Sequence, residues 1–254
     1  SVALPRGLSV DWQCSPSLGV SVSPTFGWTV PGCEEGSDAI QASYHIVVLT
    51  DGGGMVWDSG NVTSNRSVAV RYGGAPLAAG AAFRWRVSVA STTSNGGGCS
   101  SRPSSEGLFI TAFDWASSPA AWIGLGNSSS TFNLVRREVR APPAGQVQRA
   151  IAFVTAQNSW GGMEMNYRLY VNGRLASVGP GRGEATVVGS DAGRFRTQPY
   201  NTVDLTPFLP PAGGVVVLAL QTMQFSGVDP NTGNYPFPCA RGVQCNGPSQ
   251  VSQG

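Results

Sequence analysis

Apolar and polar residues alternate along much of the chain, and this alternation predicts β-strands rather than helices. Residues 82–89 show it most clearly. Apolar residues occupy every second position there, with polar residues between them: Phe83, Trp85, Val87 and Val89 against Arg84, Arg86 and Ser88. A period of two produces a strand with one buried and one solvated face. No long stretch follows the 3.6-residue period of an amphipathic helix, so we predict an all-β fold.

The first 112 residues carry about seven short strand signals, a number typical of one sandwich domain. A β-branched run at 44–49 ends at the turn 51–54, and residues 55–60 follow as its hairpin partner. The other main strand candidates are 25–28, 67–72, 82–89 and 107–111. Their spacing favours an antiparallel immunoglobulin-like or fibronectin type III-like β-sandwich, which we predict for residues 1–112.

A Trp-rich connector at 113–130 leads to a second predicted domain at 131–225. Its strand candidates are 131–139, 149–155, 167–171, 185–188, 201–205 and 215–223. The pair Asn172-Gly173 predicts a hairpin turn, because both central residues of that turn need positive φ. We interpret this block as a second antiparallel β-sandwich of jelly-roll type. Residues 226–254 are rich in Pro, Gly and Asn and are predicted to form an irregular tail.

Charge and length exclude several classes of partner. The 254 residues include 16 basic and 14 acidic side chains, a net charge of +2. Nucleic-acid and anionic-membrane binding need a basic patch that this balance does not provide. No apolar run approaches the roughly 20 residues that span a bilayer. Residue 1 is Ser, so we expect a soluble, processed or excised piece.

The five cysteines predict disulfides rather than a metal site. Cys239 and Cys245 bracket a short loop that a disulfide closes easily, and Cys14 and Cys33 are expected to form a second bridge. Cys99 then remains, although it could instead pair with Cys14 or Cys33. No CxxC pair occurs and the chain has one histidine, so no zinc site is predicted.

Three triplets predict N-glycosylation, at Asn61, Asn65 and Asn127. Together with the cysteines they favour a secreted, extracellular protein. The alternative is a cytosolic protein whose cysteines and triplets are incidental.

Catalytic signals are weak. His45 is the only imidazole and lies in an apolar strand, which favours a structural or surface position over a general base. The segment 179–183 lacks the Lys-Ser/Thr ending of a phosphate loop. The acidic residues form no convincing pair along the sequence, so no catalytic residue is predicted.

Sugar binding is easier to support. Sugars are bound by aromatic faces against their C–H groups and by planar polar groups on their hydroxyls. Five residues of the second domain have these types: Trp160, Asn172, Arg182, Glu184 and Tyr200. The alternative is that the two aromatic residues belong to the core or its rim and that 179–183 is only a turn.

The order of several motifs resembles the N-terminal β domains of bacterial-type α-L-rhamnosidases. In the first block these are Pro24–Trp28, Gln41–Ile46, Val56–Gly60, Tyr72–Leu77 and Phe83–Val87. In the second they are Trp122–Gly124, Leu134–Val139, Tyr167–Arg174, Gly179–Arg182 and Tyr200–Thr206. The resemblance covers about residues 20–225. It implies a fibronectin-like module followed by a rhamnosidase N-terminal, carbohydrate-binding type of sandwich.

In the family that this chain resembles, an (α/α)6 barrel downstream of the β domains hydrolyses terminal α-L-rhamnose with inversion. This chain ends at Gly254 without a helical repeat, so no catalytic residue is transferred to it, and its status as part of an enzyme is left open. Some β domains of the family bind rhamnose with calcium; their ligands are not matched residue by residue in this chain, so a calcium site is left open as an alternative. No cofactor and no metal residue are therefore assigned.

The sequence thus predicts a non-catalytic β-domain portion of a secreted α-L-rhamnosidase-like glycoside hydrolase, which supports the barrel and binds carbohydrate. The expected partners are rhamnose-containing carbohydrate and a C-terminal catalytic part. The alternative is an extracellular structural or adhesive glycoprotein that reuses these domains and associates with other chains.

Overall fold

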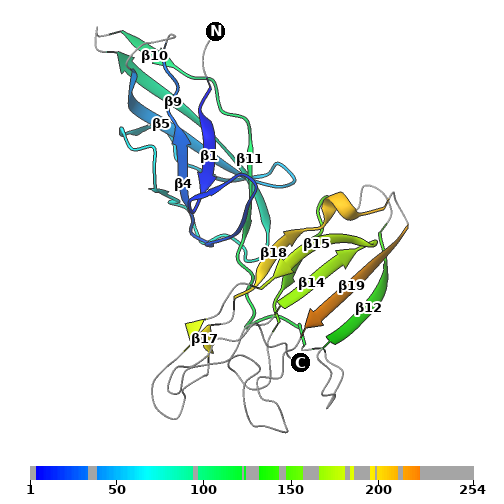
Figure 1. The fold of residues 1–254 in the computed structure, drawn as a ribbon. Coiled ribbons are helices and arrows are strands. Elements are labelled where there is room, and N and C mark those ends of the chain that lie inside the picture. Colours follow the sequence, from blue (N-terminus) through cyan, green and yellow to red (C-terminus); the bar gives the residue numbers. More distant parts are fainter. Residues whose placement is uncertain are drawn as a thin grey trace, which may run out of the picture. The chain divides into compact units, whose positions relative to one another are not determined.

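The computed structural model describes residues 4–33, 39–93, 97–121, 123, 132–142, 147–156, 166–180, 184–185, 195–197, 199–210 and 214–223. The chain divides into two compact units, Ser1–Ser118 and Pro119–Gly254 (Figure 1). Within the described residues, all regular structure is strand except the 3-10 turn η2 (Thr206–Phe208). The predicted all-β class is confirmed. No described helix is long and apolar enough to cross a bilayer.

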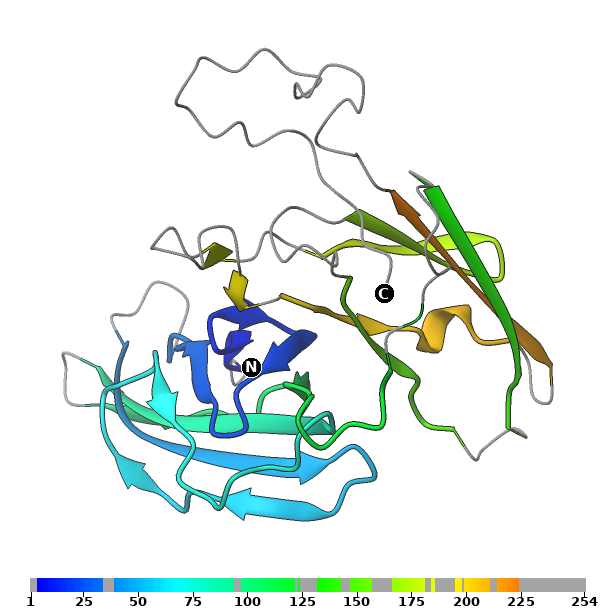
Figure 2. The same ribbon diagram turned by 90° about the horizontal axis from the view of Figure 1, so that it is seen from below.

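The first unit contains two sheets, which face each other in Figure 2. The smaller has the strand order β2-β1-β4-β8; the larger has the order β3-β11-β9-β5-β6, with β10 on β9 and β7 on β5. The strands are β1 (Arg6–Val10), β2 (Gln13–Cys14), β3 (Ser17–Val20), β4 (Thr25–Thr29), β5 (Ala39–Thr50), β6 (Met55–Asp58), β7 (Val62–Thr63), β8 (Val70–Arg71), β9 (Ala82–Thr93), β10 (Gly98–Ser100) and β11 (Gly107–Thr111).

One strand pair of the first unit departs from the antiparallel pattern that the sequence predicts. β3 runs parallel to β11, with Phe109 opposite Ser17. The N-terminal segment pairs first with β4 through β1 and then crosses to the other sheet as β3. In the larger sheet, β3 pairs with the edge of β11, so the backbone groups along that edge of β11 are hydrogen-bonded instead of unpaired.

The first core confirms the alternation of β9. Phe83, Trp85, Val87 and Val89 are buried, whereas Arg86 is exposed. The Trp85 ring lies 4.6 Å from that of Phe26, measured between ring centroids. Offset or tilted aromatic pairs at this spacing add stability beyond their buried area.

The disulfide of the first unit corrects one prediction. Cys33 is bonded to Cys99, so the pairing Cys14–Cys33 is wrong, and Cys14 is exposed and free. The strand register explains this. Ala39 at the start of β5 lies opposite Thr93 at the end of β9, and β10 folds back so that Cys99 lies opposite Ser91. Both cysteines therefore meet at one end of the larger sheet, while Cys14 lies in the smaller sheet. Cys239 and Cys245 lie outside the described residues.

The second unit contains a four-stranded sheet, β12-β19-β14-β15, and two pairs, β13-β18 and β16-β17. The strands are β12 (Phe132–Arg140), β13 (Ile151–Val154), β14 (Asn166–Val171), β15 (Arg174–Gly179), β16 (Glu184–Ala185), β17 (Phe195–Thr197), β18 (Asn201–Asp204) and β19 (Val215–Met223). All of these pairs are antiparallel. The jelly-roll type and the domain bounds stay predictions, and the tail 226–254 lies outside the described residues.

The core of the second unit joins the larger sheet to the β13-β18 pair. Tyr167, Leu169 and Val171 alternate along β14 and are buried against Val203 of β18 and Val216 of β19. The Asn-Gly turn between β14 and β15 is confirmed, with φ of 51° at Asn172 and 78° at Gly173.

Candidate carbohydrate-binding site

The structure describes three of the five predicted sugar-binding residues. Trp160 and Arg182 lie outside the described residues. Glu184 lies in β16, where its backbone pairs with Thr197 of β17. Tyr200 directly precedes β18, and Asn172 occupies the turn between β14 and β15.

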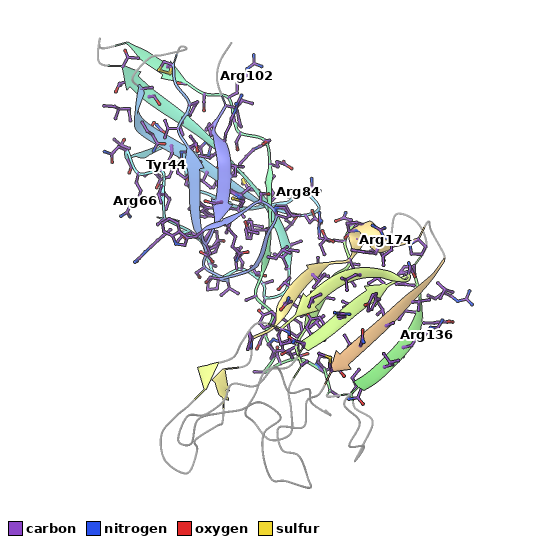
Figure 3. All side chains as sticks on the ribbon, viewed as in Figure 1. Tyr44, Arg66, Arg84, Arg102, Arg136 and Arg174 are labelled. Carbon is purple, nitrogen blue, oxygen red and sulfur yellow. A yellow bond between two sulfur atoms is a disulfide. The ribbon has the colours of Figure 1, made fainter. Side chains whose placement is uncertain are left out.

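Asn172 uses both ends of its side chain within the fold. Its Oδ1 accepts a hydrogen bond from the backbone N–H of Val217 at 2.8 Å, and its Nδ2 donates to the backbone oxygen of Phe208 at 2.9 Å. Next to it, the guanidinium of Arg174, labelled in Figure 3, lies 4.9 Å from the centre of the Phe208 ring. These contacts tie the hairpin turn to β19 and η2, so Asn172 has a structural role.

Tyr200 lies at the other end of the same hairpin. Its half-buried ring meets that of Phe153 edge to face, with centroids 6.2 Å apart. The following residue, Asn201, donates from Nδ2 to the backbone oxygen of Val178 at 3.2 Å. A Cβ on Gly179 would lie 2.7 Å from the Asn201 side chain, so glycine permits this close approach. Tyr200 is thereby placed beside the end of β15.

Strand length separates these two predicted residues. β15 has six residues between the Asn172 turn and the Asn201 contact, which corresponds to about 20 Å at about 3.3 Å per residue. One sugar ring cannot touch both ends. A site built on Tyr200 therefore excludes Asn172.

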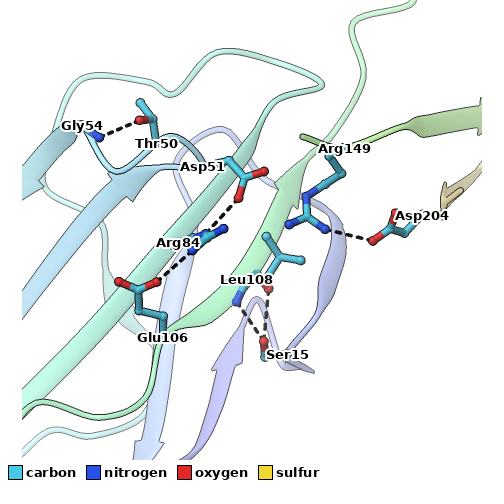
Figure 4. A network of polar contacts seen from close by, with 9 residues as sticks. All are labelled: Ser15, Thr50, Asp51, Gly54, Arg84, Glu106, Leu108, Arg149 and Asp204. Atoms are coloured by element: carbon cyan, nitrogen blue, oxygen red, sulfur yellow. Dashed lines mark hydrogen bonds and ion pairs between the residues drawn. The ribbon is translucent and has the colours of Figure 1, made fainter. Parts of the chain in front are cut away.

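Several polar side chains near β18 are hydrogen-bonded within the fold of the second unit. Arg149 donates to Asp204 at 3.1 Å (Figure 4). The backbone N–H of Thr206 donates to the other oxygen of Asp204 at 2.9 Å. The buried Tyr167 shares a hydrogen bond with Ser177 at 3.2 Å. Desolvation raises the pKa of Tyr167 above its ordinary value, and the Ser177 hydrogen bond opposes this in part.

The only histidine lies on the surface of the first unit. His45 Nε2 lies 2.6 Å from Asp58 Oδ1, and both side chains are 40% exposed. The pKa of Asp58 is lowered, mainly by the backbone N–H of Gly60 and then by His45. The neighbouring Ser59 hydroxyl accepts from the backbone N–H of Ile46 and donates to the Gly60 oxygen. No nucleophile among these residues is positioned for His45 to activate.

Two carboxylates of the first unit are neutralised by one arginine. Arg84 lies 2.9 Å from Asp51 and 3.3 Å from Glu106 (Figure 4). The pKa of Arg84 is raised, chiefly by its hydrogen bond with Asp51 and then by that with Glu106. These acids form ion pairs rather than an acid and base facing a cleft. Within the described ranges, no three His, Cys, Asp or Glu residues meet in a way that could hold a metal ion.

Sequence reasoning missed one feature of the first unit. Trp12, in the turn between β1 and β2, is 75% exposed and lines a cavity of about 200 Å3 on the smaller sheet. The sequence contains an indirect signal, since Trp12 alternates with Leu8 and Val10, but only the tertiary structure reveals the cavity.

Comparison with known proteins identifies the class of the first unit. Residues 7–106 match the family model described as "Rha78A-like, N-terminal immunoglobulin domain". The immunoglobulin-like prediction for this part of the chain is therefore confirmed.

The similar proteins are alpha-L-rhamnosidases. The curated alpha-L-rhamnosidase of Formosa agariphila is 29% identical over 126 residues, which cover 47% of this chain and 13% of that protein. The solved alpha-L-rhamnosidase of Dictyoglumus thermophilum shares 18% identity, with a TM-score of 0.63 over 87% of this chain and 25% of its own. The solved alpha-L-rhamnosidase of Aspergillus terreus also shares 18% identity, with a TM-score of 0.61. This match covers 91% of this chain and 25% of the Aspergillus protein. The resemblance to rhamnosidase β domains is confirmed.

The structural likenesses establish the fold alone at this level of identity. The chain spans about a quarter of the length of the two solved relatives and 13% of the curated one. The names of these relatives state alpha-L-rhamnosidase activity, and for this chain any part in that activity is a proposal.

Proposed function

We propose that this chain forms the non-catalytic β-domain region of a secreted α-L-rhamnosidase-like glycoside hydrolase. The observation that carries the proposal is the combination of an N-terminal immunoglobulin domain of the Rha78A-like type with a fold shared over 87% and 91% of the chain with two alpha-L-rhamnosidases. Three of the described acids support a non-catalytic role, because Asp51, Glu106 and Asp204 are each paired with an arginine.

In this proposal the two units support a catalytic barrel elsewhere in the protein, and the second unit contacts the glycan. Tyr200 presents a half-buried ring beside the end of β15, and the polar residues Arg182 and Glu184 follow that strand in the sequence. Trp160 is the second aromatic candidate. Aromatic faces and planar polar groups are the partners that pyranose rings require. The ligand class we propose is a glycan with terminal rhamnose.

Secretion is part of the same proposal. The disulfide Cys33–Cys99 is stable in oxidising compartments, whereas thiols stay reduced in the cytosol. Asn61 and Asn65 are exposed, so a glycan on either would project into solvent. Asn127 lies outside the described residues.

Calorimetric titration with oligosaccharides that end in α-L-rhamnose, with and without calcium, tests the carbohydrate contact. We expect saturable binding that Tyr200→Ala weakens about tenfold, the order of one aromatic contact. Tyr170→Ala, in β14 of the same unit, is the matched control and should leave binding unchanged. Flat titrations in both conditions would argue against the contact. Turnover of an aryl rhamnoside by the chain alone would overturn the non-catalytic role.

A second candidate function rests on Cys14. This thiol is exposed and makes no disulfide within the described part of the chain, which suits a bond to another chain in an extracellular structural or adhesive assembly. Non-reducing electrophoresis discriminates the two candidates: a covalent dimer that Cys14→Ser abolishes favours the assembly, and a monomer with an alkylatable Cys14 removes its support.

A further inference from the structure

The cavity beside Trp12 lies on the outer face of the smaller sheet of the first unit, where β1 and β4 are neighbours (Figure 1). It measures about 200 Å3, below the range of about 300–1,000 Å3 that suits drug-sized ligands. One small ring fills a space of this size. Trp12 belongs to its lining, although three quarters of this residue stays exposed.

The backbone around Trp12 is strained. Asp11 and Trp12 have φ of 45° and 67°, and Ala69, which also lines the cavity, has φ of 52°. Positive φ is costly for residues with a side chain, and especially for a bulky one. Asp11 and Trp12 are the two central residues of the hairpin turn that joins β1 to β2, where Val10 pairs with Gln13, and such a turn needs positive φ at both positions.

Asp11 supplies the contacts that enforce this strain. One carboxylate oxygen accepts from the backbone N–H and the hydroxyl of Thr25, at 2.8 and 3.0 Å, and the other accepts from the N–H of Ser21 at 2.8 Å. These three hydrogen bonds clamp the turn to the loop before β4. The Trp12 backbone is therefore held in place beside the cavity before any ligand arrives, which reduces the entropy cost of binding.

Two glycines of the cavity lining, Gly7 and Gly27, leave space that neighbouring hydroxyl groups occupy. A Cβ on Gly27 would lie 2.7 Å from Ser9 Oγ, and one on Gly7 would lie 2.9 Å from Thr29 Oγ1. Neither hydroxyl has a hydrogen-bond partner within the described ranges. Two hydroxyl groups thus remain available next to an aromatic face.

The charge of the cavity selects among ligands. Every described residue of its lining is uncharged, and Val68 adds an apolar edge that is 49% exposed. The lining itself therefore offers no counter-charge to an acidic sugar or a phosphate; the nearest cations by register are Arg6 and Arg71, which lie opposite Thr29 and Thr25 on neighbouring strands. An aromatic face, free hydroxyls and a neutral lining fit a neutral pyranose, whose C–H face stacks on indole while its hydroxyls form hydrogen bonds.

We propose that Trp12, Ser9 and Thr29 form a binding site for a neutral pyranose on the immunoglobulin-like unit. This site is separate from the Tyr200 region and does not rest on the proposed function. Trp12 provides the stacking surface, the two hydroxyls orient the ring, and Asp11 acts as a positioning residue through the turn.

Fluorine NMR of the full chain labelled with 5-fluorotryptophan tests both regions in one spectrum. The chain has seven tryptophans, and Trp12→Phe and Trp160→Phe assign the two relevant signals. Methyl α-L-rhamnopyranoside and the methyl glycosides of glucose, galactose and mannose serve as probes. We expect at least one of them to shift the Trp12 signal saturably. A shift of the Trp160 signal alone would support the proposed second-unit contact and overturn the Trp12 site.

Single substitutions test whether the sugar stacks on the Trp12 ring. Trp12→Ala should weaken the binding about tenfold, as followed by a ligand-observed NMR titration, whereas Trp12→Phe retains most of it. Ser9→Ala should weaken it less. Met55→Ala, which removes another exposed apolar side chain of the first unit, is the matched control. A Trp12 signal unmoved by every probe, or equal affinity of Trp12→Ala and Met55→Ala, would overturn the site.

Discussion

Gly107 of β11 permits close packing against a fully buried ring of the first core, and its replacement by alanine gives a sharp prediction. Gly107 lies directly opposite Trp85 of β9, and a Cβ added there would lie 2.7 Å from Trp85 Nε1 and 3.2 Å from Leu8 Cδ1. Trp85 is fully buried, so its ring cannot move into solvent. Overpacking of this kind costs about 1–3 kcal/mol of the free energy of unfolding.

For a unit of this size, such a loss lowers the melting temperature by about 4–12 °C. Differential scanning calorimetry of the full chain measures it, with the transition of the first unit followed separately because two units need not unfold together. Gly98→Ala is the matched control: the nearest atom to its added Cβ is a backbone oxygen at 3.8 Å, an ordinary contact. We expect that variant to melt within about 2 °C of the parent chain.

A double-mutant cycle tests whether the clash with the Trp85 indole causes the loss of stability in Gly107→Ala. Trp85→Phe removes Nε1, which has no hydrogen-bond partner within the described residues, so no hydrogen bond is lost with it. If the clash with the indole causes the loss, Gly107→Ala should cost less than about 1 kcal/mol when it is combined with Trp85→Phe, a coupling within the range found for residues in contact. Equal costs with and without Trp85→Phe, or a Gly107→Ala variant as stable as Gly98→Ala, would refute the reasoning.

Three further predictions concern the disulfide, the hairpin turn and acid stability. Replacing Cys33 and Cys99 by Ser opens a loop with a sequence separation of 66 and should cost about 4 kcal/mol in urea unfolding, whereas Cys14→Ser should cost almost nothing. Asn172→Ala should cost about 2–3 kcal/mol through two lost hydrogen bonds and a positive φ; Asn172→Gly, which tolerates that φ, should unfold at a higher urea concentration than Asn172→Ala. The pKa of Asp58 is lowered in the folded state, so its ionisation stabilises the fold above about pH 4 and this contribution is lost as the pH falls through the folded value. Asp58→Asn should flatten that part of the acid-unfolding curve followed by circular dichroism, and an unchanged curve would contradict the assignment.

Strands with strong alternation were predictable from the sequence, whereas short edge strands were not. The run at 82–89 became most of β9, and the apolar run at 215–223 became β19. The segment at 67–72 forms only the two-residue strand β8, because Ala69 adopts positive φ just before it. β1 and β3 were not predicted: they are short, contain glycine and owe their extension to strands that come later in the chain.

In the candidate sites too, residue type was readable from the sequence, whereas the contacts of each side chain were not. Residue type suggested Asn172 as a sugar ligand, but its side chain bonds to the backbone of Val217 and Phe208, which lie far along the sequence. Trp12 alternates with the apolar Leu8 and Val10 along the sequence, a pattern that indicates a strand position and by itself no ligand site. Its importance depends on Ser9, Thr29 and Ala69, which meet it only when β1 and β4 pair beside the loop before β8.

The sequence by itself determined the strand character, the buried face of β9 and the Asn-Gly turn, because these depend on backbone geometry and side-chain direction within a few residues. Tertiary structure alone decided that Cys33 bonds to Cys99 rather than to Cys14, which is much closer to it in sequence. It also decided which polar side chains are used within the fold and where a cavity opens. These features depend on the register between strands that are distant along the chain, and no local pattern of residues specifies that register.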